Sequence, residues 1–141
     1  MSALTGCGVV VGADDSPVPA AQPDPLEPVL AAELTLLASY DAAIAKFPAV
    51  AGKLKAVRAD HAAHVQAMRA RLDPRRAAQM PASVAAEAAG ATSAAAIAAL
   101  AKGERAQAER AGKACLTAEG ERSALLASLA ACESSHLVVV G

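Results

Sequence analysis

A glutamate and a histidine lie three residues apart near the C-terminus, in the stretch ACESSH at 131–136. On a helix, Glu133 and His136 would share one face, one turn apart, where a carboxylate and an imidazole can bind the same transition-metal ion. Residues with the same chemistry occur earlier in the chain, at Glu33, His61, His64 and Glu104. Each is a common residue, so the chemistry depends on whether the fold brings them together.

The composition favours helices. Of the 141 residues, 55% are hydrophobic and alanine dominates, whereas one Tyr, one Phe and no Trp are present. Sheets usually require the β-branched and aromatic residues that are scarce here. The net charge of −1 and the absence of a separate Lys/Arg cluster give no electrostatic basis for nucleic-acid binding. No uninterrupted run reaches the roughly 18 apolar residues that would span a bilayer.

Periodicity and helix-breaking residues predict a single all-α domain of four helices. Pro48 separates the first two helices, Asp73-Pro74 ends the second, and Thr92-Ser93 offers an N-cap for the third. We expect a short helical turn at 82–89 and a frayed end in HLVVVG. The predicted helices cover about 26–46, 49–72, 92–115 and 119–138.

Each predicted helix has an ionisable residue in the middle of its apolar face. In the third helix, for example, Glu104 falls with Leu100, Ala108 and Ala111. Burying an unpaired charge costs several kcal/mol, so such residues are paired with each other or bind a metal. The residues in question are Glu33, His61, His64, Glu104, Glu133 and His136.

The heights of these residues along the helices agree within each hairpin. Glu33 and His61 are equally far from the turn at 47, and Glu104 and Glu133 are equally far from the turn at 117–120. The connection of roughly 20 residues between the second and third helices is long for neighbouring helices, which favours a crossover along the length of the domain. A simple up-down order remains the alternative. With a crossover, we expect the polar residues of one hairpin to be displaced along the bundle axis from those of the other by about one helical turn.

Two stretches, VRADHAAHVQAM at 57–68 and ERSALLASLAACESSH at 121–136, resemble the ferritin-like domains of alanine-rich bacterial lipoproteins whose function is not established. The resemblance covers about residues 26–140. It implies a ferritin-like four-helix bundle over 26–141 with a long crossover between its second and third helices. In that plan two helices each give a Glu and two give a Glu-x-x-His, which together hold a pair of metal ions.

Carried over to this chain, the resemblance makes Glu33 and Glu104 the single ligands and Glu133 with His136 one of the pairs. The second helix departs from the plan, because His61-x-x-His64 replaces the expected Glu-x-x-His. Losing that carboxylate weakens an oxygen-activating role but leaves a set that suits a transition metal, with iron and zinc the expected ions. We expect Asp60 to be a supporting residue that orients His64.

The N-terminus suggests a lipid anchor. The stretch LTGC at 4–7 looks like the lipobox of bacterial lipoproteins, in which Cys7 would be lipidated. The Pro- and Asp-rich residues up to 25 would form a disordered tether. The domain would then be extracytoplasmic and attached to the cell membrane. Only six residues precede Cys7, too few for a signal peptide, so a cytoplasmic protein is the alternative if the start is genuine.

Three functions remain open from sequence. The first is metal binding for storage, sensing or structure, the second a metal-dependent oxidase of diiron type, and the third a metal-free interaction module with a buried Glu/His network. Cys115 and Cys132 leave two alternatives, a disulfide or an inward thiol at Cys132 beside the site. Tyr40 shares a face with Glu33, and we expect it to be a packing residue.

Overall fold

The computed structural model describes residues 23–141, whose regular secondary structure is helical, with no strand among them. Cys7 and most of the predicted tether lie outside the described residues. The helices are α1 (Leu26–Lys46), the 3-10 turn η1 (Pro48–Val50), α2 (Ala51–Arg69), α3 (Pro74–Gln79), α4 (Ser93–Cys115) and α5 (Gly120–Val140). The four helices predicted from the sequence are confirmed, with shifts at some ends.

The helix ends follow the capping residues. Asp24 Oδ1 accepts a hydrogen bond from Leu26 N (3.0 Å) at the start of α1, and Thr92 Oγ1 accepts one from Ala95 N (3.1 Å) at the start of α4. The short helix in the connection is α3, so its predicted position at 82–89 is wrong. It begins directly after Asp73, whose side chain accepts a hydrogen bond from Arg75 N (2.9 Å). An Asp cap followed by a proline starts a helix more strongly than an alanine run does.

Two other ends differ from the prediction. Helix α2 stops at Arg69 rather than about 72, and α5 continues through the expected frayed end to Val140. Val140 is fully buried against residues of α1, α2 and α4. Packing of the apolar side chains therefore holds the last turn, although valine is a weak helix former.

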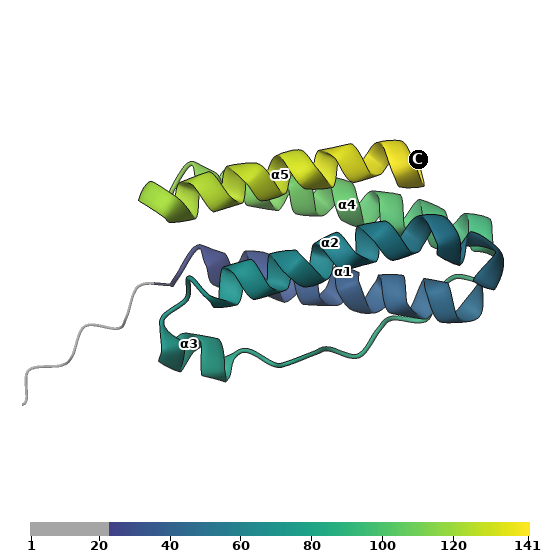
Figure 1. The fold of residues 1–141 in the computed structure, drawn as a ribbon, viewed down its shortest axis with the longest axis horizontal. Helices are drawn as coiled ribbons and strands as arrows, with labels where there is room; N and C mark the ends of the chain where they lie inside the picture. The colour runs from purple at the N-terminus through teal and green to yellow at the C-terminus, as the bar shows by residue number, and fades with distance from the viewer. Residues whose placement is uncertain (1–22) are drawn as a thin grey trace, which may run out of the picture.

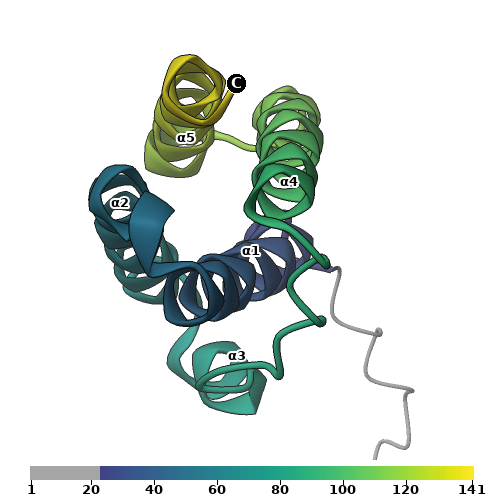
Figure 2. The same cartoon turned by 90° about the vertical axis from the view of Figure 1, so that its right-hand side faces the viewer.

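The four long helices pack side by side around a common interior, with α1 next to α2 and α4, and α5 next to α2 and α4 (Figure 2). The α1–α2 turn and the α4–α5 turn lie at opposite ends of the molecule (Figure 1). The connection between α2 and α4 contains α3 and then runs along the outside of α1. This is the predicted crossover rather than the simple up-down order, and the arrangement is compatible with a four-helix bundle.

Helices α1 and α5 are both long and apolar enough to cross a membrane by length and composition alone. The core helix of a soluble protein and a signal sequence meet the same criterion, so this is weak support for an association with a membrane. Each of the two helices buries a carboxylate, Glu33 in α1 and Glu133 in α5.

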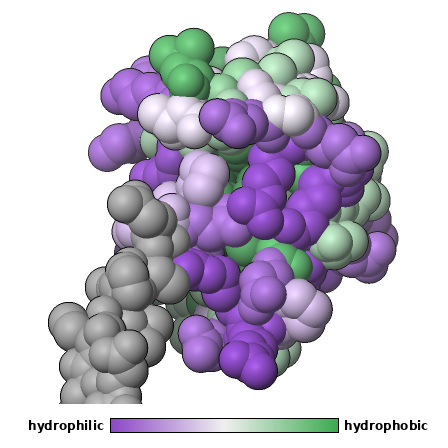
Figure 3. Space-filling view, turned by 90° about the vertical axis from the view of Figure 1, so that its left-hand side faces the viewer, coloured by the Kyte–Doolittle hydropathy of each residue, from purple (hydrophilic) through white to green (hydrophobic). Residues whose placement is uncertain are grey.

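At the end of the molecule that carries α3, hydrophilic side chains are mixed with apolar ones on the surface (Figure 3).

The apolar core has two parts, one on each side of a polar layer. One part includes Leu30 and Met68 near the start of α1, and the other includes Tyr40 and Leu54 near its end. Between them lies the layer of ionisable residues. Small side chains let the helices approach closely: a Cβ atom built on Gly103 of α4 would lie 2.7 Å from Leu36 Cδ1 of α1.

The turn into α5 depends on Gly120, which has a φ of +55°. We expect Gly120→Ala to lower the free energy of unfolding by about 1 kcal/mol, because an L side chain is strained in the left-handed region. Gly112→Ala in α4 is the matched control, since nothing lies within 4 Å of its new Cβ. That variant should instead gain roughly 0.5–1 kcal/mol. Urea denaturation measures both, and equal effects would contradict the prediction.

Candidate functional site

All six residues singled out in the sequence meet in the polar layer between the two apolar clusters. Glu33 comes from α1, His61 and His64 from α2, Glu104 from α4, and Glu133 with His136 from α5. Side chains of the α1–α2 hairpin contact those of the α4–α5 hairpin directly, as between His61 and Glu104, so the expected offset of about one helical turn does not keep them apart. His64 keeps 15% of its side chain exposed, and the other five are 5% exposed or less.

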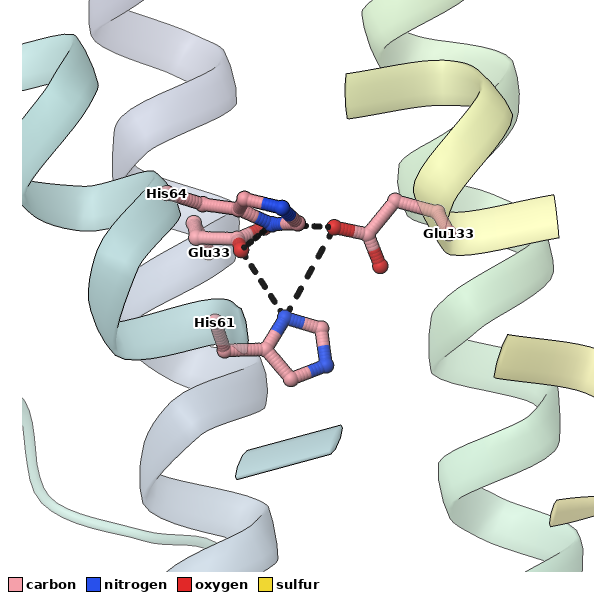
Figure 4. Close-up of side chains that lie close together, drawn as sticks. All are labelled: Glu33, His61, His64 and Glu133. Atoms are coloured by element: carbon pink, nitrogen blue, oxygen red, sulfur yellow. Dashed lines mark hydrogen bonds and ion pairs between the residues drawn. The ribbon is translucent and has the colours of Figure 1, made fainter. Parts of the chain in front are cut away.

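The first group of potential ligands joins α1, α2 and α5 (Figure 4). His61 Nδ1 lies 2.8 Å and His64 Nδ1 2.9 Å from Glu33 Oε1. Glu133 Oε1 lies 3.0 Å from His64 Nδ1 and 3.6 Å from His61 Nδ1. One ligand atom from each of these four residues lies within 4.8 Å of the others, so the group could hold a metal ion.

A second group lies next to the first and joins α2, α4 and α5. His61 Nε2 is 3.0 Å from Glu104 Oε1, and His136 Nδ1 is 3.2 Å from Glu104 Oε2. Glu133 Oε2 lies 3.6 Å from His136 Nδ1. These four residues, all buried, also offer ligand atoms within 4.8 Å of one another.

Two residues belong to both groups, and each presents a different atom to each. His61 directs Nδ1 to Glu33 and Nε2 to Glu104. Glu133 directs Oε1 to His64 and Oε2 to the second group. The two groups are therefore adjacent and share a histidine and a carboxylate, and either group could hold a metal ion.

Sequence analysis missed Gln107, which is buried and supports the cluster from α4. Its Nε2 donates to Glu33 Oε2 (2.8 Å) and to the backbone oxygen of Val29 (3.0 Å). The predicted apolar face of this helix contained Ala108, whereas the structure buries Gln107 and leaves Ala108 partly exposed. Gln107 follows Glu104 by three residues, and positions three apart share a helix face. This spacing could have predicted that Gln107 is buried beside Glu104.

Tyr40 is more than the expected packing residue. Its hydroxyl donates a hydrogen bond to Glu104 Oε1 from the neighbouring helix, and its ring lies 4.9 Å from that of His61. Burial, together with the nearby Glu104 carboxylate, raises the pKa of Tyr40 above its usual range. The phenol therefore stays protonated and acts as a donor to the cluster.

Asp60 does not contact the histidine that it was expected to orient. Its Oδ2 lies 3.3 Å from Nε2 of His136 on α5 rather than beside His64 on its own helix. Cys132 Sγ lies 3.5 Å from the same nitrogen, so it is a thiol beside the site. Cys115 and Cys132 are free, and Cys115 Sγ instead donates to Ser123 O (3.4 Å). The disulfide alternative is therefore not realised.

The histidines are held in the charged form when protons alone occupy the cluster. Burial by itself would lower the pKa of each imidazole, but hydrogen bonds to the surrounding carboxylates and their charges outweigh it. The result is a pKa raised to about 9 for His61, about 10 for His64 and about 11 for His136. A metal ion that binds these nitrogens must therefore displace protons at neutral pH.

The pKa values of the three buried carboxylates are shifted in different directions. Burial alone would raise the pKa of Glu33 and of Glu104, but hydrogen bonds from histidines bring both below the usual range. Burial raises the pKa of Glu133, and its neighbours Glu104 and Glu33 add to the rise. Its Oε2 is a buried oxygen with no hydrogen-bond partner among the described residues.

That oxygen decides whether the residues fit a metal. A buried polar atom without a partner is rare and costs about 1–3 kcal/mol. Glu133 Oε2 sits among His61, Glu104 and His136, and a cation bound there would satisfy it. Imidazole nitrogens and carboxylate oxygens are the donor set of iron and zinc sites. The chemistry of the group therefore fits a transition-metal ion.

Comparison with known proteins finds no matching family model, no matching curated protein and no matching solved structure.

The charged histidines should make the metal-free protein sensitive to alkaline pH. Because their pKa values are raised on folding, they contribute stability that is fully present below about pH 6.5, their value in the unfolded chain. That contribution is lost as the pH rises through about 9 to 11. We expect the free energy of unfolding, measured with urea and a chelator, to fall across this window.

His136→Gln removes one of the three titrating groups and serves as the comparison. Its free energy of unfolding should fall less steeply over the same pH range. Equal slopes for the two proteins would contradict a charged His136 in the folded state.

Proposed function

We propose that the buried cluster binds one or two transition-metal ions, with iron or zinc as the expected metals. The observation that carries the proposal is the pair of adjacent ligand groups that share His61 and Glu133. Structural packing alone would be better served by apolar side chains, because burying several ionisable groups costs free energy. Glu133 Oε2, which is buried without a hydrogen-bond partner among the described residues, adds a position that a bound cation would satisfy.

In this proposal Glu33 and His64 hold one ion while Glu104 and His136 hold the other. Glu133 would offer one oxygen to each ion, whereas the neutral imidazole of His61 has one free nitrogen lone pair and would bind one of them. A Glu from each of two helices and polar pairs from the other two match the plan of ferritin-like two-metal proteins. This supports the proposal that the chain is a ferritin-like four-helix bundle of the lipoprotein type, which the sequence resemblance also suggests.

The role of His61 bears on the kind of function. Its place in the ferritin-like plan belongs to a carboxylate that joins two metal ions, and an imidazole cannot supply two oxygens there. We therefore favour storage, sensing or a structural role over a diiron-type oxidase. The oxidase remains the second metal-dependent candidate, because the donor set still suits iron.

A metal-free interaction module is the third candidate, and one observation favours it. Each ring nitrogen of His61 has a carboxylate oxygen within 3.0 Å, and each of those of His136 has one within 3.3 Å. Protons alone can therefore hold the network together, and a buried polar network of this kind can specify how helices pair.

Metal analysis of protein purified without chelator tests the proposal. We expect the protein to contain iron or zinc, and Glu133→Ala to lose most of it, because this residue belongs to both ligand groups. Glu121→Ala is the matched control, since Glu121 is an exposed glutamate on the same helix. Reloading the chelated protein should raise the melting temperature of the parent and of the control, but not of Glu133→Ala.

A protein that binds no iron, zinc, copper or manganese, and whose melting temperature none of them changes, would contradict metal binding and favour the metal-free module. If metal binds, oxygen consumption on addition of ferrous iron separates the two remaining candidates. Consumption that Glu133→Ala abolishes would support the oxidase, and binding without consumption would support storage, sensing or structure.

We further propose that the protein is extracytoplasmic and anchored through a lipid on Cys7. The sequence LTGC at 4–7 and the weak membrane signal of α1 and α5 support an association with the membrane. Labelling with a radioactive fatty acid in a bacterial host should depend on Cys7. Label that persists in Cys7→Ser would contradict the anchor, whereas Cys115→Ser should retain it.

A further inference from the structure

A third set of potential ligands lies outside the buried cluster, at the surface where α2 and α5 meet. It consists of Asp60 on α2 with Cys132 and His136 on α5. The Asp60 side chain is 56% exposed, Cys132 is half-buried, and His136 is 5% exposed. Neither Asp60 nor Cys132 belongs to the two buried groups, so the proposed function leaves both without a role.

The three ligand atoms lie within 4.8 Å of one another, and the two spacings to His136 suit a tetrahedral ion. Cys132 Sγ is 3.5 Å and Asp60 Oδ2 is 3.3 Å from His136 Nε2. Bonds of about 2.0–2.3 Å to sulfur, nitrogen and oxygen place ligand atoms about 3.3–3.6 Å apart around a tetrahedral zinc ion. Cys132 and His136 are four residues apart on one helix, so a single helix face presents both.

His136 connects this outer set to the buried cluster through its two ring nitrogens. Nε2 faces Asp60 and Cys132, while Nδ1 faces Glu104 Oε2 at 3.2 Å. An ion on Nε2 would leave Nδ1 protonated and donating to a carboxylate, which is how metal-bound histidines are usually oriented. A neutral imidazole has one free nitrogen lone pair, so His136 serves one of the two sites at a time.

We propose that Asp60, Cys132 and Nε2 of His136 form an outer site that captures a divalent transition-metal ion at the edge of the buried cluster. Binding releases two protons to solvent, one from the Cys132 thiol and one from Nε2 of the charged His136 imidazole, and a water molecule completes the fourth position. The exposed Asp60 gives the ion access from water, and the shared His136 puts it next to Glu104 and the inner groups. The proposal goes beyond the proposed function, and it uses one residue of the inner site.

Cobalt(II) tests the outer site directly, because a thiolate bound to cobalt gives a charge-transfer band in the near ultraviolet that oxygen and nitrogen ligands do not give. The chain has three cysteines. The parent for the test is therefore the full chain with Cys7→Ser and Cys115→Ser, in which Cys132 is the remaining thiol. We expect this parent to develop the band on titration with cobalt, and the further change Cys132→Ser to abolish it.

Two further variants test the role of Asp60 and the competition between the outer and inner sites for His136. Asp60→Asn should weaken the affinity for cobalt, read from the band, by roughly tenfold or more, because it removes a direct charged ligand. Glu104→Gln removes an inner ligand and leaves the outer residues in place. Its band should be at least as strong as that of the parent, since the amide oxygen of the glutamine can still accept from Nδ1 of His136 while the inner site competes less for this residue.

The outcomes separate the outer site from the inner one. A band that appears in the parent or only with Glu104→Gln, and that weakens with Asp60→Asn, supports the outer site. No band in either protein, or a band that Asp60→Asn leaves unchanged, overturns it. Iron or zinc retained by Cys132→Ser in the metal analysis shows that the inner site binds on its own, so failure of one proposal does not imply failure of the other.

Discussion

The burial of six ionisable side chains in one layer is the constraint on which the rest of this structure depends. Isolated charges in an apolar interior would cost several kcal/mol each, so every one of these groups must meet a partner of opposite charge or a metal ion. Because the partners come from α1, α2, α4 and α5, the layer fixes the height and rotation of all four helices. The two apolar clusters then fill the space on either side of it.

The topology follows from the same requirement. The α1–α2 and α4–α5 hairpins each bring their own polar residues to equal heights, but two hairpins with turns at opposite ends need a connection that runs the length of the molecule (Figure 1). Small side chains keep the helices close enough for contacts across the layer, as between Gly103 and Leu36. Alanine richness therefore serves the site as well as the packing, since long side chains would hold the carboxylates and imidazoles apart.

The residues of the cluster differ in their exposure to water between its centre and its margin. Its centre holds His61 and Glu133, which touch both inner groups and are shielded from water. Its margin holds His64, partly exposed, and His136, whose outer nitrogen meets Asp60 and Cys132. Protons occupy the imidazoles at neutral pH, because the carboxylates raise their pKa values well above the ordinary range. Any ion that enters must compete with those protons, so binding and protonation are linked.

Periodicity and helix-breaking residues by themselves determined the four long helices to within a few residues at their ends, but not the short α3. The position of each ionisable residue on an apolar face predicted all six members of the cluster. These features are local: a helix repeats every 3.6 residues whatever surrounds it. Tertiary packing decided what lies between helices. It turned α4 so that Gln107 rather than Ala108 faces inward, directed Asp60 to His136 instead of His64, and placed His61 of one hairpin against Glu104 of the other. Contacts between distant segments depend on rotations and shifts of a few ångströms that no single helix encodes.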